Sequence, residues 1–396
     1  MQVEGVESAG KKYQIQFSDA QPQAEDEKLW LINLGGYDTR EFGELHRYVL
    51  VVAPHAAEAK QLGKQYFDQK WQKQHTDRVL DVDDYGEDME IKEGFGFKEI
   101  ILENVDEFIE LIRPDKKNIN QYLESVNGKF IYRGQADSNW ELEPSLFRHS
   151  PADQILSNTF DGLCFMYWVR LKEFINGCDL NSSKIPFDSK ALRDNHFNEF
   201  DSAVVFKTKA WPHAELYELI AFAQHYGVWT EFLDWTKSPL VACYFAASQA
   251  IKQPSFDDLL SVWIFDTEKE NLLNNGTEKN FEIIEVPKSA NQNISSQLGC
   301  FTLVRQNLVR GTALTFEQKP KRIKQLKLLN ELVADKKIQA LLKISLPQKY
   351  AAELLQYCSA YSINAATIFR GIEGAAIYAK ESFDIEAFRR KVTSSI

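Results

Sequence analysis

A chain of 396 residues is too long for one compact core, so its length predicts two or three domains. Hydrophobic residues make up 44% of the chain and charged residues 26%, which excludes a largely disordered or fibrous protein. The net charge of −11 excludes the whole molecule as an electrostatic partner of DNA or an anionic membrane. Any contact with nucleic acid must therefore come from a local patch.

The 5 cysteines are widely spaced, with no CxxC pair and no histidine at metal-ligand spacing. This pattern predicts reduced thiols that serve mostly as small core residues. The polar start of the chain, Met1 to Lys12, lacks the apolar core of a signal peptide. The longest apolar stretch falls short of the ~20 residues that span a bilayer. We therefore expect a cytoplasmic protein with no membrane partner.

Residues 1–80 predict a small α/β domain. Strands are expected at Tyr13 to Phe17, Lys28 to Leu34 and Tyr48 to Ala53, and a helix from Ala56 to Gln74. Residues 81–96 are rich in acids and poor in apolar side chains, which favours an exposed linker. The order of these acids differs from that of an EF-hand loop, so no metal site is predicted.

Residues 97–396 predict a larger α+β domain, because strand and helix patterns are interspersed along this part of the chain. Two helices have clear start or end signals. One is expected to have Pro212 in its first turn and to end at Gly227, and the other is expected to begin at Pro239 with Ser238 as its N-cap. The other expected strands are Lys98 to Glu103, Phe130 to Gly134, Ser261 to Asp266, Phe281 to Val286, Cys300 to Val304, Ile338 to Leu346 and Ala366 to Phe369. The other expected helices are Val105 to Ile112, Asp153 to Phe174, Gln348 to Ala360 and Ile372 to Lys380.

Motifs of several common enzyme classes are missing from the sequence. No GxSxG, HExxH or GxGxxG word occurs, which weakens hydrolase, metalloprotease and Rossmann interpretations. A basic run at residues 319–327 is open to two interpretations, a phosphate-gripping patch or the solvated face of a helix. The acidity of the chain favours the helix.

The first segment that suggests chemistry is FIYRGQ, residues 130–135, where an apolar strand leads Arg133 directly into Gly134. A guanidinium at a strand end offers a planar fork of donors that suits a pyrophosphate or a carboxylate. The alternative is a structural salt bridge to an acid such as Glu141 or Asp234. The spacing alone favours neither interpretation.

The second segment is residues 221–246, which place polar and aromatic side chains in the expected turn between two helices. The second helix would point its positive N-terminus at that turn, so the segment suggests a nucleotide pocket. The simpler alternative is that Asp234, Thr236 and Ser238 cap the helix, Trp235 fills the core and His225 is a core histidine.

Five sequence words in these regions are together similar to the bacterial FRG domain. They are YRGQ, W-x-L-x-PSLFR, QHYG-x-x-T-x-x-LDWT-x-SPLVA-x-YFA, Q-x-G-x-FTL and I-x-x-A-TIF-x-G-x-EG. The resemblance runs in the family's order from about Phe97 to Lys380. The chain departs from the family at Glu231, where arginine is usual, and at residues 369–374, where one of two acids is lost and the other is Glu373.

Residues 1–80 resemble a second family, domain of unknown function 1543, through the word KLWLINLGG and the following Glu-Leu-His and strand. That resemblance implies no activity.

The word Tyr132-Arg133-Gly134 also resembles the opening element of arginine-type ADP-ribosyltransferases. That resemblance implies a fold that clasps NAD between two small sheets, with a late acid that stabilises an oxocarbenium-like state. In this mapping Arg133 anchors the phosphates, and the acid is Glu373 as first choice or Asp234 as second. The residues expected to bind the cofactor are Gln135, Tyr226, Thr230, Trp235, Thr236 and Ser238.

The sequence thus suggests an NAD-dependent ADP-ribosyltransferase-like enzyme, with a protein or nucleic acid as acceptor and, by analogy, a role in bacterial defence or stress. The competing hypothesis is a module without catalytic activity that binds a nucleotide, a nucleic acid or a protein and uses the N-terminal domain as a sensor. Such a module would need the arginine but no positioned acid.

Overall fold

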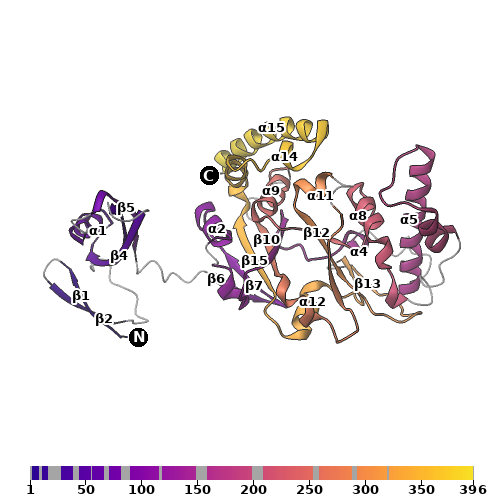
Figure 1. Cartoon of the computed structure of the whole chain (residues 1–396), viewed down its shortest axis with the longest axis horizontal. Coiled ribbons are helices and arrows are strands. Elements are labelled where there is room, and N and C mark those ends of the chain that lie inside the picture. The colour runs from indigo at the N-terminus through magenta and orange to yellow at the C-terminus, as the bar shows by residue number, and fades with distance from the viewer. Residues whose placement is uncertain are drawn as a thin grey trace. The chain divides into compact units, whose positions relative to one another are not determined.

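The computed structural model describes residues 2–8, 11–16, 28–38, 44–54, 56–66, 71–81, 90–115, 118–148, 158–198, 208–252, 258–287, 292–318 and 321–395. The chain divides into an N-terminal unit, Met1–Met89, and a C-terminal unit, Glu90–Ile396. Helices and strands are interspersed in a mixed α+β architecture (Figure 1). None of the described helices combines the length and apolar character needed to cross a membrane.

The N-terminal unit contains a hairpin and a three-stranded antiparallel sheet. Strands β1 (Gln2–Ser8) and β2 (Lys11–Gln16) form the hairpin. In the sheet, β3 (Lys28–Asp38) lies between β4 (Glu44–Ala53) and β5 (Trp71–Asp81). The expected strands are present, and β1 and β5 are additions.

The helix expected from Ala56 to Gln74 is shorter than predicted. Helix α1 spans Ala56–Gly63, a 3-10 turn follows at Lys64–Tyr66, and residues 71–81 form β5. Pairing with β3 supplies the strand's hydrogen bonds, although its polar sequence carries little strand signal. Residues 82–89 of the expected linker lie outside the described ranges. Residues Glu90–Gly94, which were also expected in the linker, form strand β6.

One eight-stranded sheet organises the C-terminal unit. All neighbouring strands are antiparallel except β15 and β7, which are parallel. The strand order is β11 (Phe281–Ile284), β12 (Gly299–Val304), β9 (Leu233–Thr236), β8 (Phe130–Gln135), β10 (Leu259–Asp266), β15 (Leu341–Pro347), β7 (Phe97–Ile101) and β6.

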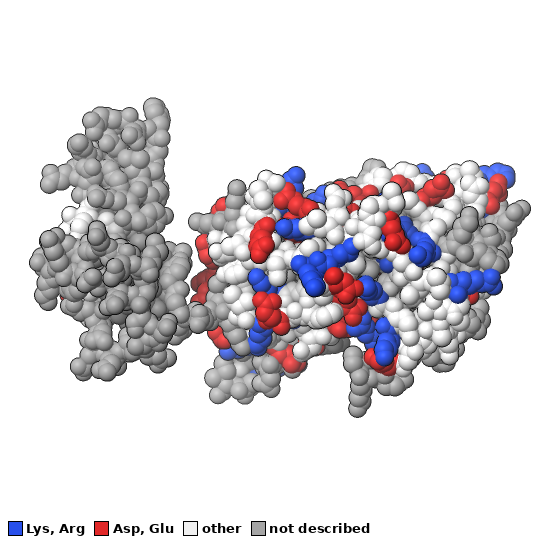
Figure 2. Space-filling view, turned by 90° about the horizontal axis from the view of Figure 1, so that it is seen from below, with Lys and Arg blue, Asp and Glu red and all other residues white. Residues whose placement is uncertain are grey.

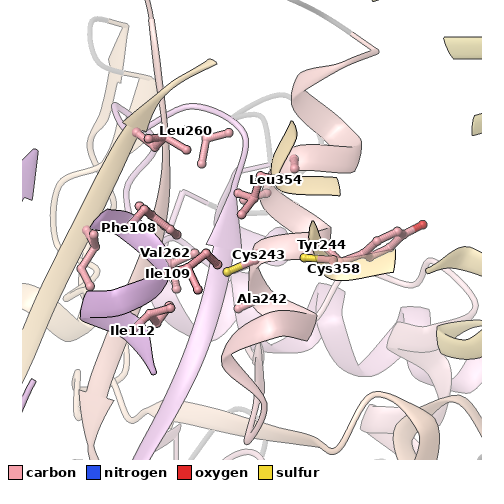
Figure 3. Packing of buried hydrophobic residues seen from close by; sticks show 14 of the residues in the cluster. Phe108, Ile109, Ile112, Ala242, Cys243, Tyr244, Leu260, Val262, Leu354 and Cys358 are labelled. Carbon is pink, nitrogen blue, oxygen red and sulfur yellow. The ribbon is translucent and has the colours of Figure 1, made fainter. Parts of the chain in front are cut away.

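Helices cover both faces of this sheet because the strand side chains alternate between them. In β10, Val262 and Ile264 face the core under helices α2 (Val105–Ile112), α9 (Pro239–Ala250) and α13 (Ala351–Ala360). Figure 3 shows side chains from α2, β10, α9 and α13 meeting in this core. Trp263 and Phe265 face the opposite core, which α12 (Leu329–Lys336) helps to close.

A third core lies around α5 (Phe160–Leu180) and α8 (Tyr217–His225). The position of Pro212 was predicted wrongly: a 3-10 turn at Ala214–Leu216 comes first, and α8 begins at Tyr217. His213, at the N-cap of that turn, makes no side-chain capping bond. The cap at Ser238 is confirmed, since its Oγ accepts a hydrogen bond from the Val241 amide.

The end of the chain is helical. Residues Ala365–Ile368 form helix α14, so the strand expected from Ala366 to Phe369 was wrong. The Asn364 amide donates to Thr367 Oγ1 at 3.1 Å, which fixes the first turn of this helix. The strand was predicted because Thr367 and Ile368 are β-branched, a residue type that favours strands. Helix α15 (Gly371–Ser395) continues well past the expected end at Lys380. All five cysteines are free and buried, as predicted.

Candidate functional site

Arg133 lies near the end of β8, and its side chain is 15% exposed. Its Nη1 donates a hydrogen bond of 2.7 Å to the Asp234 carbonyl and lies 3.9 Å from Asp234 Oδ2. Its Nε is buried and has no hydrogen-bond partner among the described residues. The adjacent Gly134 allows α9 to lie against the strand, since a Cβ there would be 1.9 Å from the Ala242 carbonyl oxygen.

The sequence suggested that Asp234 lies in a turn between two helices, but it lies on strand β9. Strand β9 pairs Asp234 with Phe301 of β12 and joins β8 through Tyr132 and Thr236. A four-residue strand whose partners are distant in sequence leaves no periodic signal, so the pattern alone missed it. The Asp234 side chain is 64% exposed, so its contact with Arg133 is not an interior ion pair.

Arg148 provides a second positive charge that acts on Arg133. It is the exposed last residue of helix α4, Ser145–Arg148. Burial lowers the pKa of the Arg133 guanidinium, the Asp234 carboxylate opposes that shift, and the charge of Arg148 adds to it. Arg133 stays protonated at neutral pH, because an arginine side chain holds its proton in proteins. The charges of Asp234 and Arg148 therefore both act on Arg133.

Gln224, Thr230 and Ser145 connect the acid of the site to helix α4. Gln224 Nε2 donates to Asp234 Oδ1 at 2.7 Å, and the Thr230 hydroxyl donates to the Gln224 side-chain carbonyl. The Thr230 amide donates to Ser145 Oγ at 3.0 Å, and the Leu146 amide donates to the Thr230 carbonyl at 3.0 Å. The helix that carries Arg148 is thus fixed to the loop that orients Asp234.

Five predicted binding residues have structural contacts in place of open ligand-facing groups. Trp235 is buried, and its Nε1 donates to Thr302 Oγ1 at 2.9 Å. Thr236 donates to the Gln297 carbonyl at 2.6 Å, and Ser238 caps α9. Gln135 is buried, where it donates to the Glu141 carbonyl and accepts from Trp263. Thr230 acts through Gln224, as described above.

Tyr226 and Glu373 are both exposed. The Tyr226 ring packs edge to face on Phe222 and His225, which leaves much of it open to a ligand. Glu373 lies in the first turn of α15. Within the described part of the chain, no hydrogen bond or ion pair joins Glu373 to Arg133 or Asp234.

The C-terminal segment does approach α8 through Asn293 of helix α11 (Gln292–Ser296). The Asn293 amide nitrogen lies 3.0 Å from His225 Nε2, and its carbonyl oxygen accepts from the Arg370 amide at 2.8 Å. His225 is exposed and bonded at the surface, so it is not a core histidine. This bridge fixes the segment before Glu373 beside the end of α8.

Glu231, where the FRG pattern has arginine, is an acid 6% exposed. Burial raises its pKa to about 8, and the positive charge of Arg305 only partly opposes this. Arg305 itself donates to Glu282 Oε1 at 2.6 Å and to the Tyr217 hydroxyl at 2.6 Å. The Glu231 carboxyl group is therefore mostly protonated at neutral pH and is part of the protein interior.

The basic run does not form the expected helix face. Residues Lys321–Ile323 form strand β14, which pairs with β13 (Phe316–Gln318). Arg322 forms ion pairs with Glu331 at 2.6 Å and Glu141 at 3.8 Å, so Glu141 serves Arg322 and not Arg133. Positive and negative side chains are mixed on the face shown in Figure 2. Lys319 lies outside the described residues.

Two residues of the site were missed from the sequence, Arg148 and Gln224. Both stand in the words that carry the family resemblance, PSLFR and QHYG, and those words were the available signal. Among the residues with described positions, no three His, Cys, Asp or Glu side chains gather as a metal-ligand group. The Asp234 side chain is 64% exposed and Arg148 is exposed, so both are open to a ligand, whereas the Arg133 side chain is only 15% exposed.

Comparison with protein families finds one match, the FRG domain, at residues 128–255. No curated protein and no solved structure matches the chain. The likeness to ADP-ribosyltransferases therefore depends on a short sequence word, and that of residues 1–80 to domain of unknown function 1543 stays a prediction. The matched segment contains Arg133, Arg148, Gln224 and Asp234. The polar site thus lies within the segment of the chain that matches the FRG domain.

Proposed function

We propose that the FRG domain binds a nucleotide through its phosphate groups at Arg133 and Arg148, and that NAD is this nucleotide. The observation that carries the proposal is the contact of the Arg133 guanidinium with the exposed carboxylate of Asp234, and the charge of Arg148 also acts on Arg133. Arginine forks bind phosphate oxygens with charge-assisted hydrogen bonds. The buried Nε of Arg133, which has no partner in the described residues, is a donor that a ligand or a water would satisfy.

The exposed ring of Tyr226 supports a nucleotide over a bare anion. Aromatic side chains stack on nucleotide bases. Tyr226 lies two residues after Gln224, the residue that holds the Asp234 carboxylate, so its ring could stack on the base of a nucleotide bound there. Asp234, with one oxygen held by Gln224, has a second oxygen that can accept a hydrogen bond from a ribose hydroxyl.

Calorimetric titration of the full chain with NAD tests this proposal. We expect Arg148→Ala to weaken binding at least tenfold, because it removes a charge-assisted contact of about 1.5 kcal/mol or more. Arg133→Lys, which keeps the charge but not the fork, is expected to weaken binding as well. Arg390→Ala is the control, since it removes an exposed arginine that is ion-paired to Glu386 on α15. Equal affinities for all four proteins would refute the proposal.

A second candidate is ADP-ribosyl transfer, which the exposed carboxylate of Asp234 beside Arg133 favours. In this reaction the bond between ribose C1′ and nicotinamide breaks, and its electron pair leaves with neutral nicotinamide. The acceptor then bonds to C1′ and gives up a proton. Asp234 would stabilise the developing cation, a role that fixed carboxylates serve in glycosidic cleavage.

Release of nicotinamide, with NAD alone and with protein, DNA or RNA acceptors, tests the second candidate. We expect Asp234→Asn to lower release by about a hundredfold or more. Glu373→Gln is the matched comparison, because it removes the acid that the sequence placed first. Binding of NAD without release would identify a module without this activity. Release that depends on Glu373 and not on Asp234 would show that Glu373, in α15, is the acid that stabilises the developing cation.

A further inference from the structure

The charges around Arg133 limit how much negative charge its ligand can carry. The charged groups that act on the Arg133 guanidinium are the carboxylate of Asp234 and the guanidinium of Arg148. A phosphate bound to Arg133 therefore lies beside a carboxylate of its own sign, so a second negative charge on that phosphate weakens its binding.

The carboxylate is held in place and cannot easily turn away from a phosphate. Gln224 Nε2 holds Asp234 Oδ1 at 2.7 Å, and Gln224 is in turn held by the Thr230 hydroxyl. The other oxygen, Oδ2, lies 3.9 Å from Arg133 Nη1. Any phosphate bound to that guanidinium consequently meets a fixed negative charge next to its own.

We infer that the site selects phosphates esterified on both sides, such as the pyrophosphate of a dinucleotide, over terminal phosphate monoesters. The inference rests on the nucleotide binding proposed above and specifies its class. A diester phosphate carries one negative charge, whereas a terminal monoester carries about 1.5 to 2 at pH 7. The additional charge of a monoester is repelled by Asp234, whose Oδ2 lies 3.9 Å from Arg133 Nη1.

The experiment compares ADP with its β-methyl ester, which differ by one methyl group and one ionisable oxygen. In calorimetric titrations of the full chain at pH 7.5, we expect the methyl ester to bind about fivefold more tightly. This factor is the size of one like-charge contact at a partly exposed carboxylate. We expect Asp234→Asn to abolish the difference by improving ADP binding. Asp335→Asn, which removes an exposed acid paired with Lys327, is expected to leave it unchanged.

Each result has a distinct meaning. Equal or tighter binding of ADP by the unmodified protein would overturn the inference while leaving nucleotide binding intact. A preference for the ester that persists in Asp234→Asn would overturn the role of the carboxylate. Failure of NAD, ADP and the ester all to bind would overturn the proposed function and this inference with it.

Discussion

Replacement of Glu231 by glutamine is expected to stabilise the protein, and increasingly so as the pH rises. The folded state holds this carboxyl group with a pKa of about 8, against an ordinary value of 4.5. The unfolded chain therefore releases the proton at a lower pH than the folded chain does. Stability from the bound proton is complete below pH 4.5 and is lost as the pH rises toward 8.

The magnitude follows from the difference between the two pKa values. Each unit of pH between them costs about 1.4 kcal/mol. At pH 7 the folded state has therefore lost about 3 kcal/mol from this one group relative to pH 4.5. Glutamine has the same shape as the protonated acid and does not titrate, so Glu231→Gln escapes this loss.

Chemical denaturation followed by tryptophan fluorescence, at several values between pH 5 and pH 7.5, measures the effect. We expect the free energy of unfolding of Glu231→Gln, minus that of the unmodified protein, to grow by about 3 kcal/mol over this range. Glu353→Gln, at an exposed acid on α13, is the control and should differ by less than about 0.5 kcal/mol. A difference for Glu231→Gln that stays constant with pH would refute the reasoning.

Other predictions concern the packing that supports the site. Gly134→Ala should cost about 2 kcal/mol or more in unfolding free energy, because its Cβ would meet the α9 backbone. Gly177→Ala, with nothing within 4 Å, should gain about 0.5–1 kcal/mol, and equal effects of the two would contradict the packing described. Ser238→Ala should cost about 1 kcal/mol by loss of the cap, and an unchanged denaturation midpoint would argue against it. Tyr244→Phe should cost about 1–3 kcal/mol, since buried Glu381 loses the hydroxyl that donates to it, whereas Glu381→Gln in the same background should recover part of that loss.

Elements with a local signal were predictable from the sequence. Helix α2 matches its predicted bounds, and the Ser238 cap with Pro239 at the first turn correctly marked the start of α9. Strand β8 was found because an apolar run ends in polar residues. In each of these cases the information lies within one element, in its periodicity or its cap.

Elements that depend on distant partners were not predictable. Strands β5 and β9 are polar or short, and their hydrogen bonds come from strands that are distant in the sequence. The candidate site was likewise predictable in part. The proximity of Arg133 and Asp234 was anticipated, but the tie from Asp234 through Gln224 and Thr230 to Ser145 depends on tertiary structure. Spacing along the chain therefore could not single out Arg148.

The five buried thiols give the protein a built-in set of reporters. They lie on α5, α9, β12 and α13, and the N-terminal unit contains none. Burial raises the pKa of the Cys164 thiol, which suppresses the thiolate that alkylating reagents attack. Maleimide labelling followed by peptide mass spectrometry would thus time the opening of each part of the C-terminal unit without introducing any probe, and added ligand should slow the modification of the parts it holds closed.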